Sequence, residues 1–188
     1  MMARRVYLFL FAAVLLTAFG CDSGSDVTTT TPAFVCDDGG PAGANGVTLG
    51  CGAANADTQQ VDIVLGGPAT VSGLSFNVMF DGSKLAYASY DASGVNDLFP
   101  GALVSVLESS EPNSVPGFKD VVVAIQMTGG TALTDAAGQH VVLSLNFQRA
   151  SATLFSPTPL EFNDERTLTA TPVTAGTTFA SSLTLAYQ

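Results

Sequence analysis

The feature that most constrains the fold is a two-residue alternation of apolar and polar side chains. In residues 74–80 the even positions hold Leu, Phe, Val and Phe, with Ser75 and Asn77 between them. In residues 141–147 the apolar side chains stand at the odd positions, beginning with Val141. A period of two places successive side chains on opposite faces of an extended strand. Each segment therefore predicts a β-strand with one buried face, and no segment keeps a helical period for long.

Shorter apolar runs, separated by turns rich in Gly and Pro, extend this pattern along the chain. The turns include Gly66-Gly67-Pro68, Asp81-Gly82 and Gly129-Gly130. Many short strands at such spacing predict an all-β fold, an antiparallel β-sandwich, over residues 57–188. A segment of that length is sufficient to bury a core between two sheets. The further predicted strands are residues 61–65, 84–90, 102–107, 120–128, 167–171 and 182–187.

The N-terminus predicts export and a lipid anchor. Arg4 and Arg5 precede an apolar run of 14 residues, 6–19, which fits a signal peptide and is shorter than the ~20 residues that span a bilayer. The run ends in Gly20-Cys21, which resembles the bacterial lipobox. We therefore expect a signal peptide over residues 1–20, lipid attachment at Cys21 and a disordered tether over residues 21–35. The alternative is an ordinary signal peptide with an incidental cysteine.

Two cysteines remain if Cys21 is acylated, and both lie in the Gly-rich segment 36–56. In an oxidising compartment, the simplest interpretation of Cys36 and Cys51 is a disulfide. A metal site that adds Asp37 or Asp38 is the alternative. Such sites need four ligands at characteristic spacing, and the segment has neither a CxxC motif nor a nearby His. We therefore predict no metal and no cofactor.

The charge of the chain excludes several classes of partner. Six Lys and Arg stand against 16 Asp and Glu. Removal of Arg4 and Arg5 with the signal peptide leaves 4 basic residues against 16 acidic ones, a net charge of −12. Such a chain is a poor partner for nucleic acid and for anionic lipid. We therefore expect it to meet a membrane only through its N-terminal lipid.

Catalytic signatures do not emerge from the sequence. His140 is the only histidine, so any Ser-His-Asp or Cys-His mechanism must use it, and its place at the start of a strand predicts a surface residue. A glycosidase needs two carboxylates in a cleft, but the glutamates lie in or beside polar turns. We therefore predict that the protein is not an enzyme. The candidate carboxylates are Glu108, Glu111, Glu161 and Glu165.

Residue types alone suggest two further kinds of binding site. Carbohydrate-binding sheets present exposed aromatic rings, and Tyr90 and Phe99 lie nearest to polar turns, although most rings are expected in the core. Several Asp and Asn side chains could supply oxygen ligands to a calcium ion, but they lack the spacing of an EF-hand loop. We therefore interpret them as turn residues. The remaining aromatic candidates are Tyr87, Phe118 and Tyr187, and the calcium candidates are Asp81, Asp91, Asn96 and Asp97.

Three segments carry a resemblance to a known family. Residues 71–85, VSGLSFNVMFDGSKL, resemble the second and third strands of cohesin domains, with Gly82 in place of the usual Pro. Residues 120–128 with 138–147, and residues 158–164, resemble later strands and turns of the same family. The resemblance spans residues 59–185 and implies a nine-stranded jelly roll of the same broad class as several bacterial carbohydrate-binding modules. Cohesins bind dockerin modules through one sheet face, but no partner-specific residue carries over to this chain.

These observations together predict a non-catalytic, lipid-anchored binding module at the cell envelope, whose partner is a protein module or a polysaccharide. The ligand-binding residues stay unknown. The alternatives are a structural envelope lipoprotein without a specific ligand and a polysaccharide-degrading enzyme. A row of exposed aromatics favours carbohydrate, whereas a flat apolar patch with a polar rim favours a protein partner. A uniformly hydrophilic surface favours the structural role.

Overall fold

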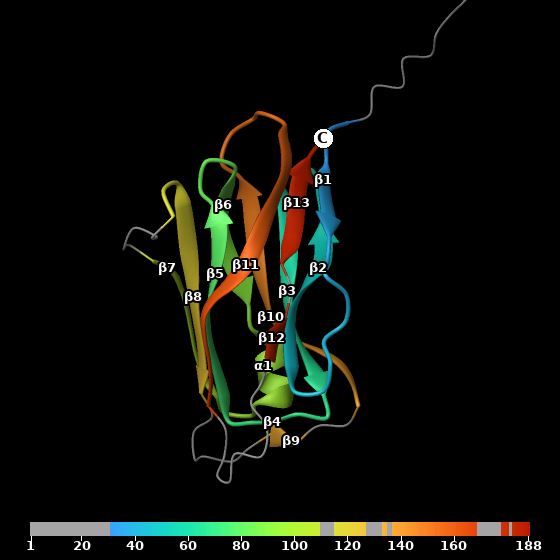
Figure 1. The fold of residues 1–188 in the computed structure, drawn as a ribbon, viewed down its shortest axis with the longest axis vertical. Helices are drawn as coiled ribbons and strands as arrows, with labels where there is room; N and C mark the ends of the chain where they lie inside the picture. The colour runs from blue at the N-terminus through green and yellow to red at the C-terminus, as the bar shows by residue number, and fades with distance from the viewer. Residues whose placement is uncertain (1–30, 110–114, 127–132, 135–136, 169–177, 181) are drawn as a thin grey trace, which may run out of the picture. The chain divides into compact units, whose positions relative to one another are not determined.

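Two stacked sheets contain most of the chain (Figure 1). The computed structural model describes residues 31–109, 115–126, 133–134, 137–168, 178–180 and 182–188. Its strands pair antiparallel except for β12 with β2, which confirms the predicted all-β sandwich. The six-stranded sheet has the order β1 (Phe34–Asp37), β13 (Leu183–Tyr187), β11 (Phe155–Leu168), β5 (Gly73–Asp81), β8 (Phe118–Gln126) and β7 (Leu103–Glu108). The five-stranded sheet has the order β12 (Thr178–Ala180), β2 (Gly46–Ala54), β3 (Thr58–Gly67), β10 (Gly138–Arg149) and β6 (Leu85–Asp91).

The core lies between the sheets, where inward side chains of facing strands meet. Phe80 of β5 and Phe147 of β10 contact each other across the sandwich, with ring centroids 5.2 Å apart. Phe76 of β5 contacts Phe179 of β12 at 5.7 Å. The even positions of β5 are buried and its odd positions from Ser75 to Asp81 are half-buried. The alternation therefore predicted correctly which face of this strand is inward.

A β-bulge changes the predicted facing of the longest alternating segment. The pairing of β10 with β3 shifts register between Val141 and Leu143. Val142 is consequently fully buried, whereas Val141 is 45% exposed. The expectation that Val141 points inward was wrong, because the extra residue of a bulge reverses the alternation on one side of it. Beyond the bulge, Leu143, Leu145 and Phe147 are buried as predicted.

The sandwich begins earlier than residue 57, where the sequence analysis placed its start. β1 occupies residues assigned to the tether and to the Gly-rich segment, and β2 lies wholly within that segment. The glycines of β2 allow close packing against β3, since a Cβ on Gly52 would lie 2.8 Å from the Gln60 side chain. Gly52 therefore serves close strand packing, whereas Gly40 and Gly43 of the same segment have no neighbouring atom within 4 Å of a built Cβ. β1 and β12 lie at the sheet edges and add to the nine predicted strands.

Short elements complete the described chain. Helix α1 (Ser93–Leu98) has six residues, too few to produce a visible helical period. β4 (Thr70–Val71) pairs with β9 (Leu133–Thr134). The predicted strand over residues 167–171 corresponds in part to the end of β11, and its residues 169–171 lie outside the described residues.

The predicted signal peptide and the acylated Cys21 also lie outside the described residues, as does all of the tether before residue 31. Within the described part of the chain, no helix has the length and apolar character needed to span a membrane. The signal, the lipid and the tether therefore stay predictions.

Candidate binding surface

The outward side of β7, β8, β5 and β11 forms a broad surface, which we call the β7–β11 face. Four neighbouring strands spaced ~4.8 Å apart give it a width of about 14 Å. The strand register places Leu107, Val122, Asn77 and Asn163 in one row across it. The described side chains of this face are Leu103, Ser105, Leu107, Asp120, Val122, Ala124, Gln126, Ser75, Asn77, Met79, Glu161 and Asn163.

The apolar part of this face lies on β7 and β8. Leu103 is 65% exposed and Leu107 is 50% exposed. Leu107 pairs with the half-buried Val122 of β8, whereas Leu103 pairs with the exposed Gln126. Ser105 lies between the two leucines and pairs with the half-buried Ala124. Alternate positions of a strand in a two-layer sandwich face the core and the solvent, and β7 follows this pattern. Val104 and Val106 pack against the core, which fixes the two leucines outward. The outward leucines of β7 thus form the exposed apolar part of this face.

Polar and acidic groups surround this patch. Asn77 and Asn163 continue the row of Leu107 toward β11. In the next row, Met79 lies between Asp120 and Glu161. Asp120 is buried, so Glu161 is the exposed carboxylate of this row. An apolar centre with a polar rim is typical of protein interfaces.

The outer side of the five-stranded sheet is different, because it is polar and rich in glycine. Asp62 Oδ1 accepts hydrogen bonds from Gln60 Nε2 at 2.7 Å and from Ser144 Oγ at 2.6 Å. Beside this cluster lies a hollow of about 330 Å³, whose lining includes Asp38, Asp62 and Gln139. The loop that forms its wall is held by Gln139, which donates to the Ala42 carbonyl and accepts from the Ala42 N–H.

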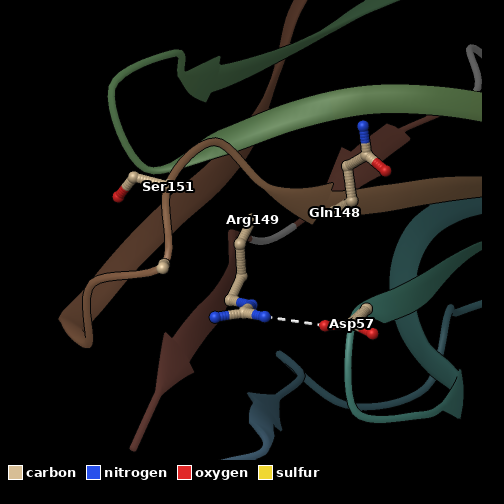
Figure 2. Close-up of a pocket in the computed structure, with 5 residues that line it drawn as sticks. Asp57, Gln148, Arg149 and Ser151 are labelled. Carbon is tan, nitrogen blue, oxygen red and sulfur yellow. Dashed lines mark hydrogen bonds and ion pairs between the residues drawn. The ribbon is translucent and has the colours of Figure 1, made fainter.

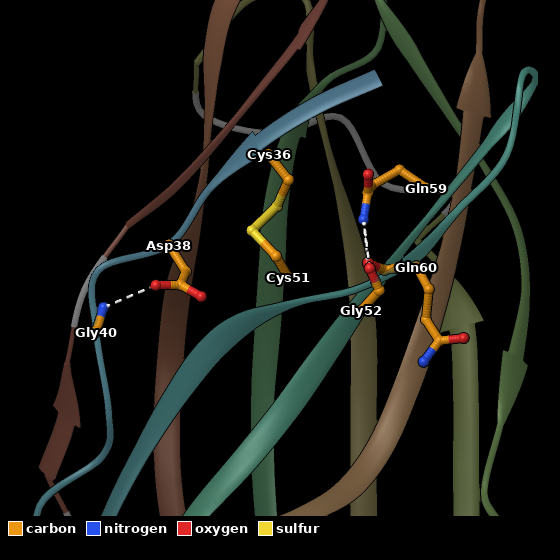
Figure 3. Close-up of a disulfide and its surroundings, with 7 residues drawn as sticks. All are labelled: Cys36, Asp38, Gly40, Cys51, Gly52, Gln59 and Gln60. Atoms are coloured by element: carbon orange, nitrogen blue, oxygen red, sulfur yellow. Dashed lines mark hydrogen bonds between the residues drawn. A yellow bond between two sulfur atoms is a disulfide. The ribbon is translucent and has the colours of Figure 1, made fainter. Parts of the chain in front are cut away.

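The carboxylates of this hollow do not resemble a catalytic pair. Asp38 is exposed and accepts a hydrogen bond from the Gly40 N–H at 3.2 Å (Figure 3). Asp62 is hydrogen-bonded to two polar side chains. A general acid of a glycosidase requires a carboxyl group in apolar surroundings, and neither carboxylate has them.

The predicted disulfide is confirmed. Because both cysteines take part in this bond, neither has a free thiolate to bind a metal ion in the alternative site. Cys36 Sγ and Cys51 Sγ are bonded at 2.03 Å (Figure 3). Cys36 lies on β1 of the six-stranded sheet and Cys51 on β2 of the five-stranded sheet. The bond therefore joins the two layers of the sandwich near the point where the chain enters it.

The aromatic candidates do not form a row on either sheet. Among the five, Tyr90 is exposed, at 43%, while Tyr87 and Phe118 are half-buried. Phe99, which the sequence suggested as an exposed ring, is fully buried, because the short helix α1 directs it into the core. Tyr187 is 5% exposed, and its hydroxyl donates to the backbone carbonyls of residues 32 and 56.

Neither the calcium candidates nor the two glutamates whose side chains are described, Glu108 and Glu161, gather into a site. Asp81 Oδ1 accepts hydrogen bonds from Ser83 N and Oγ, and its Oδ2 lies 3.2 Å from Lys84 Nζ. Burial tends to raise the pKa of Asp81, but these hydrogen bonds and the Lys84 charge outweigh it and hold the pKa below its usual value. Across the described residues, no group of three or more His, Cys, Asp and Glu is placed to hold a metal ion.

The remaining predicted residues have separate positions. Asp91 accepts a hydrogen bond from the Ser93 N–H, while Asn96 and Asp97 are exposed on α1. Glu108 forms an ion pair with Lys119 at 2.6 Å. His140 is half-buried at the start of β10 rather than fully exposed. Glu161 is exposed on the β7–β11 face, and the side chains of Glu111 and Glu165 lie outside the described set.

A second hollow, of about 370 Å³, lies where the chain enters the sandwich. Asp57 and Arg149 line it and form an ion pair at 2.7 Å (Figure 2). The Arg149 guanidinium also lies over the Tyr187 ring, 4.3 Å from its centroid. The stacked, paired arginine therefore has a structural role that the sequence did not predict.

Comparison with known proteins identifies the fold. Neither the family models nor the curated proteins gave a match to this chain. Among solved structures, a CaDoc0917–CaCohA2 complex matches with a TM-score of 0.50 at 16% identity, over 72% of this chain and 95% of that one. CaCohA2 comes from Clostridium acetobutylicum. A type I cohesin–dockerin complex from Clostridium thermocellum matches with a TM-score of 0.49 at 11% identity, over 80% of this chain and 95% of that one. The described sandwich therefore has the cohesin-like jelly-roll fold.

Proposed function

We propose that this chain is a non-catalytic module that binds a protein partner through the β7–β11 face. The observation that carries the proposal is the pair of exposed leucines, Leu103 and Leu107, on a flat sheet surface with a polar rim. The proposed partner is a module of the dockerin type, since the solved structures similar to this fold include complexes with dockerins. A lipid on Cys21 would hold the module at the cell envelope.

The two leucines supply enough apolar surface to matter for binding. Full burial of a leucine side chain contributes about 1.5–3 kcal/mol, and both side chains are at least half exposed before binding. Val122 and Met79 extend the apolar contact toward the centre of the sheet. The asparagines of β5 and β11 offer amide donors and acceptors, which orient a partner without adding charge.

The alternatives receive less support from the surface. A carbohydrate platform would need several exposed rings, and Tyr90 alone is exposed among the aromatic candidates. A purely structural role was expected to accompany a uniformly hydrophilic surface, and the apolar patch on β7 does not fit that description. We therefore do not propose polysaccharide binding, and the experiment below measures it as a competing result.

The test is a calorimetric titration of the protein with a panel of purified dockerin modules and with an array of polysaccharides. The double variant Leu103→Glu/Leu107→Glu is expected to weaken dockerin binding by roughly 100-fold or more, from the transfer energy of the two side chains. Val141→Glu is the matched control, because Val141 is 45% exposed on the other sheet. The control should bind like the unmodified protein.

Three results would contradict the proposal. They are equal loss of binding in the Val141→Glu control, unchanged binding by the double leucine variant, and binding of glycans together with no binding of any dockerin. The anchor is checked separately by the intact mass of the native protein. An acyl adduct on Cys21 is expected, and a mass without one would remove the anchor and leave the binding face untouched.

A further inference from the structure

Both ends of the described chain meet at one end of the sandwich. The N–H of Ala33 donates to the Gln188 carbonyl at 2.9 Å, and the N–H of Gln188 donates to the Ala33 carbonyl at 3.2 Å. The Tyr187 hydroxyl also donates to the carbonyl of Pro32. Figure 1 shows the start of β1 and the end of β13 side by side at this end, together with the loop between β10 and β11. Any anchor before residue 31 therefore enters the domain here.

The loop between β10 and β11 presents uncharged and apolar groups at the same end. Residues 150–160 contain no Asp, Glu, Lys or Arg. Leu154 is 59% exposed. It borders a hollow of about 420 Å³ whose lining also includes Phe155, Pro157 and Tyr187. The loop therefore offers an apolar side chain and an apolar recess directly beside the point of chain entry.

Three aromatic side chains pack against one another beneath the recess. The rings of Phe34 and Tyr187 lie 5.3 Å apart, and the ring of Phe155 lies 6.3 Å from each of them. The guanidinium of Arg149 covers Tyr187 from the other side. Phe34 and Tyr187 are buried, so these rings support the recess from below, and Leu154 is the exposed apolar side chain beside it.

Charge is also balanced at this end, in a chain that is strongly acidic. Lys84, Lys119 and Arg149 are each paired with a carboxylate, at 3.2, 2.6 and 2.7 Å. The turn that contains Gly82 and Lys84 contacts the segments that carry the other two cations. The N–H of Ala150, which follows Arg149, donates to the Lys84 carbonyl, and the Lys119 side chain packs against Gly82. The three cations whose side chains are described are thus each paired with a carboxylate, and Arg149 is the one that lies beside the recess.

We infer that this end of the sandwich is a membrane-contact surface, with Leu154 and the adjoining recess seated in the interfacial region of a zwitterionic bilayer. The inference rests on the lipid anchor of the proposed function and adds a second contact to it. Nine residues separate Cys21 from Thr31, a reach of up to about 35 Å when extended, so the loop and the acyl chains can meet the same bilayer. Insertion of one apolar side chain beside a covalent lipid needs little energy of its own, because the anchor supplies the local concentration.

Such an orientation also serves the proposed binding face. The β7–β11 face runs along the long side of the sandwich, while the contact surface occupies its end (Figure 1). Seating the end on the bilayer keeps the leucines of β7 above the membrane and open to a partner. It also separates the acidic remainder of the domain from the lipid headgroups.

The experiment uses the acylated full chain, purified in detergent, verified by intact mass and reconstituted in phosphatidylcholine vesicles. The chain contains no tryptophan, so Leu154→Trp introduces a single indole. Its emission is expected at short wavelength and is expected to be quenched by brominated phosphatidylcholine. Leu107→Trp, on the β7–β11 face, is the matched control and is expected to emit at long wavelength without quenching. Ser151→Trp repeats the measurement on the same loop if the Leu154→Trp variant has a lowered Tm.

Each outcome decides between supporting and overturning the inference. Equal emission and equal quenching of the indoles introduced at positions 154 and 107 in acylated protein would overturn it while leaving the anchor intact. A short-wavelength emission from position 154 that brominated lipid does not quench would indicate contact with a second copy of the chain and would also overturn it. A protein without acyl mass would refute the anchor and this inference together, while dockerin titration of the β7–β11 face would proceed unchanged.

Discussion

The disulfide between Cys36 and Cys51 allows a quantitative prediction about folding stability. It closes a loop with a sequence separation of 15 residues. In the chain-entropy model, a loop of this length restricts the unfolded chain enough to stabilise the fold by about 3 kcal/mol. The folded state holds the same segment independently, because β1 pairs with β13 and β2 pairs with β3. Loss of the bond should therefore leave the native strands in place and act mainly on the unfolded state.

The perturbation is the double variant Cys36→Ala/Cys51→Ala in a chain that also carries Cys21→Ser, so that no third thiol exchanges with the pair. One kcal/mol changes Tm by about 2–4 °C for a protein of this size, so Tm should fall by roughly 6–12 °C. Thermal unfolding is followed by far-UV circular dichroism, with and without reductant. Reductant should lower the Tm of the Cys21→Ser chain by a similar amount and should not affect the double variant.

Two results would refute this reasoning. A change in Tm of less than about 2 °C would mean that the loop restricts the unfolded chain far less than its length requires. A loss of β-sheet signal in the reduced protein at 25 °C would mean that the bond, rather than strand pairing, holds β1 and β2 in the sandwich. Reduced protein and the double variant should otherwise agree, because the cysteines are only half-buried and the alanine substitution removes little packing.

Three further substitutions test the core, a close backbone approach and one titrating group. Phe76→Ala should lower the free energy of unfolding in urea by about 3–5 kcal/mol, because Phe76 is 1% exposed within an aromatic cluster; a loss below about 1 kcal/mol would contradict the packing described. Gly66→Ala should lower Tm because the new Cβ would overlap the carbonyl oxygen of Gly43, whereas Gly43→Ala, with no atom within 4 Å, should not. Asp81 has a lowered pKa, so its stabilisation is present above the unfolded value of 3.8 and is lost as pH falls through the lower folded value. Asp81→Asn should therefore be less stable than the unmodified protein at neutral pH, and the difference should shrink as the pH falls below 3.8; a difference in Tm that stays constant from neutral to acid pH would refute the assignment.

The strands with a clean alternation were predictable because burial of one face selects their register. In β5, a shift of one residue would bring Asn77 into the core in place of Phe76, so sequence and structure agree there. The bulge at Val141 was not predictable, since both Val141 and Val142 are apolar and either fits the core. β2 was missed because its glycines, such as Gly52, are read locally as turn residues, while their role is close approach to a neighbouring strand.

The binding surface was hidden in the sequence for a related reason. Residues 103–107 read Leu-Val-Ser-Val-Leu, which is apolar on both faces of a strand, and local pattern alone suggests burial on both sides. The two-layer architecture supplies the missing fact, because each strand of these sheets has the core on one face and solvent on the other. Val104 and Val106 pack against the core on the inner face of β7. On its outer face, nothing in the described sandwich covers Leu103 and Leu107. An edge strand with apolar residues on its open face carries an aggregation cost, and a partner that covers this face would offset that cost. The outward side of β7 therefore links the fold to the proposed binding function.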